Sequence, residues 1–244
     1  NLIDKFIDFL MLYPTVQNIT FFGGEPLLNV DGIEYLCQQV NNLRPDIGFY
    51  CQTNGTLMNK RIDNLIHRYK IKFTLSIDGS KEDNDRNRVF KDNTGSFDVI
   101  NENYKRFKES ALSIEATYDG KSKYTKKEIA EYLTKKYGCT NVSVCELFGN
   151  SRTIEFTSPK KDIEDILNCS SIPINRTREL LLGFFTKTNQ CNFCSAGTQL
   201  LNIDSDGKIY PCHLLIDKKE KYLLGDLTSF NNCLLYTSDA ADDS

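Results

Sequence analysis

The chain has 244 residues and a formal net charge of −3, so it lacks the basic surface that nucleic-acid-binding proteins need. No apolar run approaches the roughly 20 residues that span a bilayer, and no signal-peptide pattern opens the sequence. We therefore expect neither a nucleic-acid nor a membrane partner. Nine cysteines without a secretory signal argue against a disulfide framework and favour thiols that serve metal or redox chemistry.

The chain opens inside a helical pattern. Apolar residues recur at helical spacing from its first turn, at Leu2, Ile3, Phe6, Phe9 and Leu10. The first residue is not Met. We therefore expect that further sequence precedes the chain.

Strand-like and helix-like patterns then alternate. Short β-branched and aromatic runs, typical of strands, lie at 19–22, 47–51, 72–77, 112–117 and 141–145. Amphipathic runs, typical of helices, lie between them at 30–43, 59–69, 97–107 and 125–137. This alternation predicts an α/β fold in which right-handed crossovers place successive strands side by side in a parallel sheet.

Two regions depart from the alternation. The polar segment 86–96 predicts a loop at the active face. From residue 172 onward we predict a helix near 176–185, and then a hairpin whose strands at 200–203 and 208–210 are joined by a turn at 204–207. We expect this second region to form a separate small domain.

Three successive predicted strands end in small, polar, glycine-bearing residues, at 23–26, 52–55 and 76–79. The carboxyl ends of parallel strands share one edge of a sheet, where α/β and barrel enzymes bind their ligands. At the first of these ends, Gly23 and Gly24 let a ligand approach the backbone, and Pro26 favours an extended Glu25 whose carboxylate points outward. This combination suits a ligand that carries both ammonium and carboxylate groups, such as an amino acid.

In their order and spacing, Gly23-Gly24-Glu25-Pro26, Thr53-Asn54-Gly55 and Ser76-Ile77-Asp78-Gly79 resemble the motifs of radical S-adenosylmethionine (radical SAM) enzymes. The nearest resemblance is to members with a C-terminal SPASM extension, which include peptide maturases and anaerobic sulfatase-maturing enzymes, and it extends over roughly residues 1–230. It implies a partial (β/α)6 barrel at 1–170 that holds a 4Fe–4S cluster and SAM. A linker helix and an incomplete SPASM domain would follow at 171–231. The composition of 232–244 breaks from what precedes it, so we expect a non-native tail there.

The resemblance also implies roles for single residues. Four residues match the element that binds the methionyl ammonium of SAM, namely Gly23, Gly24, Glu25 and Pro26. Ser76 matches a residue near the SAM carboxylate or ribose, and Gln52 and Asn54 are weaker candidates for cofactor or substrate contact. Arg88 is expected to pair with the SAM carboxylate, because a guanidinium binds a carboxylate bidentately. The alternatives are that Arg88 is a solvated loop charge and that Asp78 caps a turn through its own backbone.

One departure from the family is large. Its ligand loop, Cys-x3-Cys-x2-Cys, would precede Gly23, but that spacing occurs nowhere in the chain. Three thiolates are needed to hold the cluster that reduces the sulfonium of SAM. We therefore expect the loop to lie upstream of the chain, and the chain by itself to be inactive.

The C-terminal cysteines match part of a second motif. Cys194, Gly207 and Cys212 have the spacing that opens the SPASM pattern, so the resemblance implies ligands of an auxiliary 4Fe–4S cluster, with Cys191 as a further ligand. A rival hypothesis is a structural zinc site formed by these three cysteines and His213. We expect the remaining cysteines of the ordered elements, namely Cys37, Cys51, Cys139 and Cys145, to be small buried side chains.

Taken together, the resemblance implies an enzyme that cleaves SAM to a 5′-deoxyadenosyl radical and modifies a peptide or protein side chain, for example by a thioether cross-link. Flavodoxin or ferredoxin would supply the electron. Because such clusters are sensitive to oxygen, we expect the protein in the reducing cytoplasm. The alternative within the family is formylglycine formation in a sulfatase. An alternative from another class is a non-catalytic SAM- or peptide-binding module with a structural zinc site.

Overall fold

The computed structural model describes residues 1–146, 196–197, 199–218 and 221–228, which group into two units. The sheet unit begins at Asn18 and is described to Glu146. The helix–hairpin unit combines residues 1–17 with the described residues from 196 onward. The sequence-based division instead placed residues 1–17 with the barrel. The predicted helix at 176–185 and the tail at 232–244 lie outside the described residues.

The sheet unit is built on parallel strands in chain order, as predicted. They are β1 (Asn18–Phe21), β2 (Gly48–Thr53), β3 (Lys72–Ser76), β4 (Ala111–Tyr118) and β5 (Val142–Glu146), and each pairs with the next. The second strand runs two residues further than predicted, so Gln52 and Thr53 belong to the sheet. Because all strands run the same way, their carboxyl ends meet at one edge.

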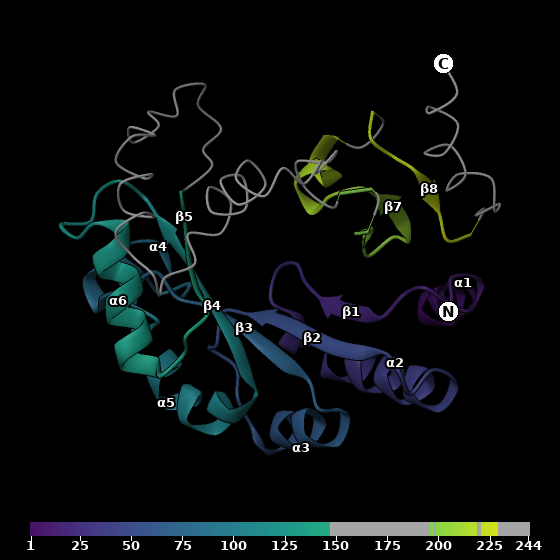
Figure 1. Cartoon of the computed structure of the whole chain (residues 1–244), viewed down its shortest axis with the longest axis horizontal. Helices are drawn as coiled ribbons and strands as arrows, with labels where there is room; N and C mark the ends of the chain where they lie inside the picture. Colours follow the sequence, from purple (N-terminus) through teal and green to yellow (C-terminus); the bar gives the residue numbers. More distant parts are fainter. Residues whose placement is uncertain (147–195, 198, 219–220, 229–244) are drawn as a thin grey trace, which may run out of the picture. The chain divides into compact units, whose positions relative to one another are not determined.

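Crossover helices cover one side of this sheet (Figure 1). They are α2 (Val30–Leu43), α3 (Lys60–Tyr69), α5 (Phe97–Phe107) and α6 (Lys126–Tyr137), as predicted within one residue at each end. Polar caps begin three of them: the side chains of Asn29, Asn59 and Thr125 accept from backbone N–H groups of the first turn. The fully buried side chains between these helices and the strands include Phe73, Leu75, Ile100, Ile114 and Leu133, so the hydrophobic core lies on the helix side.

The other face of the sheet carries polar side chains at the alternate strand positions. They include Thr20, Tyr50, Gln52, Thr74, Ser76, Ser113 and Glu115. The Thr74 and Ser113 hydroxyl oxygens are 2.7 Å apart in a hydrogen bond that joins β3 to β4. Purely parallel sheets usually bury both faces in apolar contacts. A polar second face therefore marks the side of this sheet on which a ligand would lie.

A short helix, α4 (Lys81–Asn87), precedes the segment 86–96 that we predicted to be a loop and includes its first two residues. It has no apolar stripe, so hydrophobic periodicity does not reveal it. The feature that indicates this helix is the cap at its N-terminus. The Ser80 hydroxyl accepts from the Asp83 N–H at 3.3 Å and donates to the Asp83 carboxylate at 2.7 Å. The loop proper begins after Asn87 and is closed by a bridge between Val89 and Gly95.

The helix–hairpin unit joins the two ends of the described chain. Its elements are α1 (Leu2–Leu12), β6 (Asn202–Ile203), β7 (Lys208–Tyr210), η3 (His213–Lys218) and β8 (Gly225–Asp226), with β6–β7–β8 antiparallel. Phe9 of α1 forms a buried cluster with Ile209 and Leu227. Gly207, at φ +87°, turns the hairpin so close to α1 that a Cβ there would lie 2.6 Å from Leu2 Cδ1. The predicted hairpin is therefore present, and α1 completes its core.

None of the helices in the described ranges has the length and apolar character needed to cross a membrane.

Candidate functional site

The three glycine-bearing strand ends lie together at the carboxyl edge of the sheet, because β1, β2 and β3 are neighbours. Side chains connect them directly. Glu25, after β1, accepts hydrogen bonds from the end of β2, and Gln52 of β2 lies 3.5 Å from the Ser76 hydroxyl of β3. The predicted convergence at one edge is confirmed.

The prediction for the orientation of Glu25 was wrong, although its backbone is extended as expected before Pro26, at φ −129° and ψ 106°. The carboxylate bends across to β2 instead of pointing outward. Oε1 accepts from the Thr53 hydroxyl at 2.9 Å and from the Leu27 N–H at 3.1 Å, and Oε2 accepts from the Asn54 N–H at 2.8 Å. Thr53 is buried, so its hydroxyl needs an acceptor within the protein, and Glu25 provides one.

Gly23 and Gly24 leave their backbone open. They adopt φ angles of +93° and +45°, and no atom lies within 4 Å of the position where either would carry a Cβ. Both residues are exposed. Pro26 then begins the short helix η1 (Pro26–Asn29). The carboxyl end of β1 thus presents bare peptide groups to a ligand, as the sequence predicts.

The end of β2 is organised by Asn54. Its Oδ1 accepts from the Thr56 N–H at 2.9 Å and from the Thr56 hydroxyl at 2.7 Å, which closes a turn. Gly55 follows at φ +72°, and a Cβ there would lie 2.6 Å from Leu75 Cδ1. The Asn54 side-chain oxygen is therefore used locally, and only its amide nitrogen is available for a ligand.

Glu115 joins this set although the sequence analysis did not single it out. It lies on the polar face of β4, opposite Ser76 in the register, and its Oε2 accepts from Gln52 Nε2 at 2.8 Å. Its signal in the sequence is a carboxylate at an alternate position of a strand between Ile114 and Ala116, both of which are buried. A strand residue of this kind faces away from the core.

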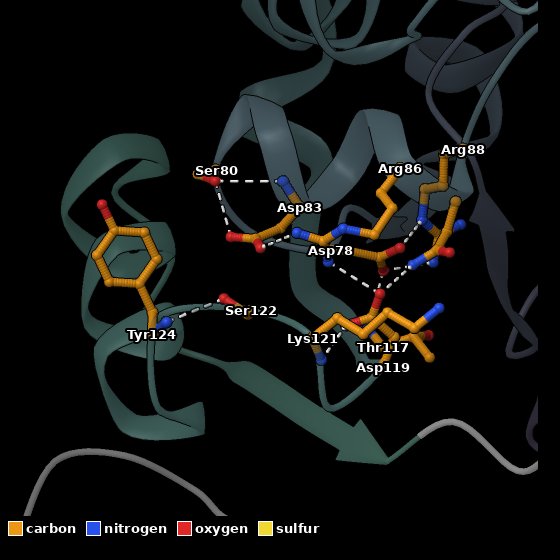
Figure 2. Close-up of polar contacts among 11 residues, drawn as sticks. Asp78, Ser80, Asp83, Arg86, Arg88, Thr117, Asp119, Lys121, Ser122 and Tyr124 are labelled. Atoms are coloured by element: carbon orange, nitrogen blue, oxygen red, sulfur yellow. Dashed lines mark hydrogen bonds and ion pairs between the residues drawn. The ribbon is translucent and has the colours of Figure 1, made fainter.

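Arg88 and Asp78 form an ion pair, which neither of the alternatives for these residues anticipated (Figure 2). Nε and Nη2 of Arg88 donate to the two oxygens of Asp78, each at 2.8 Å. Asp78 Oδ1 also accepts from the Thr117 N–H at 2.8 Å, so the carboxylate joins the end of β3 to β4 and does not cap its own turn. Arg88 is thus neither a solvated loop charge nor wholly free to bind a ligand.

A second ionic network lies beside this pair (Figure 2). Arg86 donates from Nη1 to Asp119 at 2.9 Å and from Nη2 to Asp83 at 3.0 Å. Asp119 also accepts from the Asn87 amide and from the Lys121 N–H. Burial by itself raises the pKa of Asp119, but the hydrogen bonds from Asn87, Arg86 and Lys121 outweigh it and lower the pKa to about 2. This network fixes α4 to the loop after β4.

The low pKa of Asp119 predicts a change in stability with pH. A carboxyl that ionises more readily in the folded chain stabilises it above the unfolded pKa of 3.8, and that contribution is lost as pH falls toward 2. The difference corresponds to roughly 2 kcal/mol. We expect Asp119→Asn to lower the free energy of unfolding by about this amount at pH 7 and to match wild type near pH 2, as measured by urea unfolding at each pH.

Glu131→Gln is the control for this experiment, because Glu131 is exposed on α6. It should leave the pH dependence of unfolding as in wild type. If the free energies of unfolding of wild type and Asp119→Asn differed by the same amount from pH 7 to pH 2, the prediction would be contradicted.

The cysteines of the described residues do not form a metal site. Cys37, Cys51 and Cys139 are buried as predicted, and burial raises the pKa of the Cys37 thiol to about 12. Cys145 is exposed, against the prediction, and it lies on the polar face of β5. Cys212 lies 4.0 Å from His213 Nδ1, and Cys191 and Cys194 fall outside the described residues. Within the described ranges, no three histidine, cysteine, aspartate or glutamate side chains are placed so that they could hold a metal ion.

The chain belongs to the radical SAM superfamily, whose family model matches residues 3–135. Among curated proteins, it is 40% identical over 87 residues to an uncharacterized protein of Methanocaldococcus jannaschii, covering 35% of this chain and 30% of that protein. It is 25% identical over 150 residues to the radical SAM cyclopropyl synthase TigE of Paramaledivibacter caminithermalis, covering 59% of this chain and 31% of TigE. The chain thus spans about 30% of the length of these relatives.

The fold resembles that of anSMEcpe. The structure of native anSMEcpe with bound AdoMet matches 96% of this chain and 70% of that protein, at a TM-score of 0.74 and 20% identity. A structure of anSMEcpe with bound AdoMet and the Cp18Cys peptide matches at a TM-score of 0.70, with 20% identity over 96% of this chain and 71% of that protein. The five-stranded parallel sheet is therefore part of a radical SAM barrel, which confirms the predicted fold class.

Proposed function

We propose that this chain is the SAM-binding part of a radical SAM enzyme that modifies a peptide or protein side chain. The observation that carries the proposal is the meeting of three polar strand ends, including the open backbone of Gly23 and Gly24, at the carboxyl edge of the sheet. One structural neighbour supports the substrate class, because anSMEcpe has been solved with bound AdoMet and peptides. TigE, which is named as a radical SAM cyclopropyl synthase, supports the general reaction.

The residues at this edge fit a ligand with the groups of SAM. The open peptide groups at Gly23 and Gly24 would accept from its ammonium, Arg88 would bind its carboxylate, and Ser76 would contact its carboxylate or ribose. Asn54 would contribute its side-chain amide. In this proposal Glu25 acts indirectly, because its hydrogen bonds to Thr53 and Asn54 hold the first two strand ends together.

The cluster that gives the family its chemistry does not fit the residues of this chain. The spacing Cys-x3-Cys-x2-Cys is absent, and the described residues contain no alternative set of three ligands. We therefore assign the chain's own residues to binding and orienting SAM, and derive no radical step from them. We propose that the ligand loop is encoded upstream of Asn1, so that the chain alone is inactive. An upstream reading frame without that loop would contradict this part of the proposal.

A pair of matched glycine variants tests SAM binding. Gly24→Asn keeps a residue type that tolerates positive φ but places a side chain over the open backbone. Gly138→Asn makes the same exchange at φ +66°, where α6 ends, again with nothing within 4 Å of the Cβ position. We expect Gly24→Asn to weaken SAM binding roughly tenfold or more by isothermal titration calorimetry, and Gly138→Asn to leave it unchanged. Equal affinities of the two variants would contradict the proposed site.

The C-terminal part of the proposal concerns the hairpin. We propose that it opens a SPASM domain in which Cys191, Cys194 and Cys212 ligate an auxiliary 4Fe–4S cluster, and that flavodoxin or ferredoxin is the electron donor. The partial match of Cys194, Gly207 and Cys212 to the family spacing supports this. Anaerobic reconstitution of the intact protein with iron and sulfide should give a brown protein with a reducible signal in electron paramagnetic resonance. A colourless protein that binds zinc would instead support a non-catalytic binding module.

A further inference from the structure

Arg88 is fixed both at its backbone and at its guanidinium, although 25% of its side-chain surface is exposed. At the backbone end, the Arg88 N–H donates to the Asn84 carbonyl at 2.8 Å, and the Arg88 carbonyl accepts from the Ser96 hydroxyl at 2.7 Å. At the guanidinium end, both donors of one edge are held by Asp78. A long and otherwise mobile side chain is therefore ordered before any ligand arrives.

Asp78 is fixed in turn. Its side chain is 4% exposed, and a buried carboxylate is costly unless its charge is paired and its oxygens accept hydrogen bonds. Arg88 supplies the charge, and the Thr117 N–H supplies a third hydrogen bond from the adjacent strand. The orientation of the guanidinium is thus set by the ends of β3 and β4, which are rigid parts of the fold.

The pair leaves part of the guanidinium unused. The Nη1 group of Arg88 has no partner among the residues that the structure describes, whereas the nearby Arg86 uses both of its Nη groups on Asp119 and Asp83. Arg86 therefore has the geometry of a purely structural link between two carboxylates. Arg88 has spare donors on a partly exposed side chain at the edge where the strand ends meet.

We propose that Asp78 is a positioning residue, which holds one edge of the Arg88 guanidinium so that its remaining donors receive the carboxylate of SAM. This inference rests on the proposed function, because it requires SAM at this edge. Ordering the arginine in advance removes the entropic cost of fixing it during binding. Asp78 itself does not touch the ligand, so removing it should affect only the part of the affinity that depends on the ligand carboxylate.

Two ligands separate this role from a general contribution to folding. SAM and decarboxylated SAM differ in the carboxylate, so their affinities are compared in the same preparation of the intact protein by calorimetry. Asp78→Asn keeps the size of the side chain and an acceptor for the Thr117 N–H. We expect it to weaken SAM binding roughly tenfold and to change the affinity for decarboxylated SAM by less than about threefold. In an Arg88→Lys background, Asp78→Asn should cause no further loss of SAM affinity, since both changes remove the same interaction.

Asp119→Asn is the matched control, because it breaks the neighbouring network of Arg86 and leaves the Arg88 pair in place. It should preserve the wild-type ratio of the two affinities. An unchanged ratio in Asp78→Asn, or an additional loss in the Arg88→Lys background, would overturn the positioning role while leaving the proposed function intact. A wild-type protein that binds neither ligand would overturn the proposed function and this inference with it.

Discussion

Replacing Phe9 with alanine is expected to unfold the hairpin of β6 and β7 while the parallel sheet stays folded. Phe9 is 7% exposed and forms the buried cluster of the helix–hairpin unit with Ile209 and Leu227. Truncating a buried phenylalanine costs about 3–5 kcal/mol, and a core this small has few other contacts to compensate. The change should therefore remove most of the local stability of this unit.

Hydrogen–deuterium exchange measures this effect separately in each unit. In Phe9→Ala, the amides of β7 should lose protection, and those of β2 and β3 should keep it. Leu12→Ala is the control, because Leu12 lies on the same helix with 54% of its surface exposed. If the β7 amides stay protected in Phe9→Ala, α1 does not complete the core of the hairpin, and the division of the chain into these units is wrong.

Much of the sheet unit was predictable because its strands and helices carry separate periodicities. The short apolar runs and the amphipathic stretches locate both kinds of element within two residues, and their alternation fixes a parallel order. Glycines and Pro26 identify the strand ends, because positive φ and an extended residue before proline are local requirements that a sequence displays directly. The convergence of these ends then follows from parallel geometry.

Partnerships between distant residues were not predictable in the same way. An amphipathic pattern shows that α1 buries a face but not that the face packs on Ile209, which lies about 200 residues away along the chain. The charge of Arg88 likewise does not reveal that Asp78 holds it, because that depends on where the loop after α4 returns to the sheet. The polar helix α4 was missed since its cap is its main signal. The orientation of Glu25 depends on the donors of a neighbouring strand.

The orientation of Glu25 leads to the second large expected effect. Glu25→Gln should lower the free energy of unfolding by about 3 kcal/mol, because an amide cannot accept at both positions where the carboxylate now does. In the wild type, the Asn54 nitrogen lies 2.8 Å from Glu25 Oε2. If the amide oxygen of the glutamine takes the place of Oε1, its amide nitrogen faces the Asn54 N–H. Two donors would then oppose each other at the contact that joins the first two strand ends. SAM affinity should fall as well, as a consequence of displaced strand ends.

Glu115→Gln supplies the comparison that separates a structural from a ligand-binding role for the Glu25 carboxylate. Glu115 is exposed and accepts from a single described side chain, Gln52, so an amide oxygen can replace its carboxylate oxygen. We expect this control to change stability by less than about 0.5 kcal/mol in urea unfolding. Glu25→Gln could be as stable as Glu115→Gln and yet bind SAM more weakly than that control. Glu25 would then contact the ligand directly, and the site would not depend on its hydrogen bonds to Thr53 and Asn54. If stability and affinity fall together, the carboxylate acts by holding β1 against β2, and the ammonium of SAM is left to the open backbone of Gly23 and Gly24.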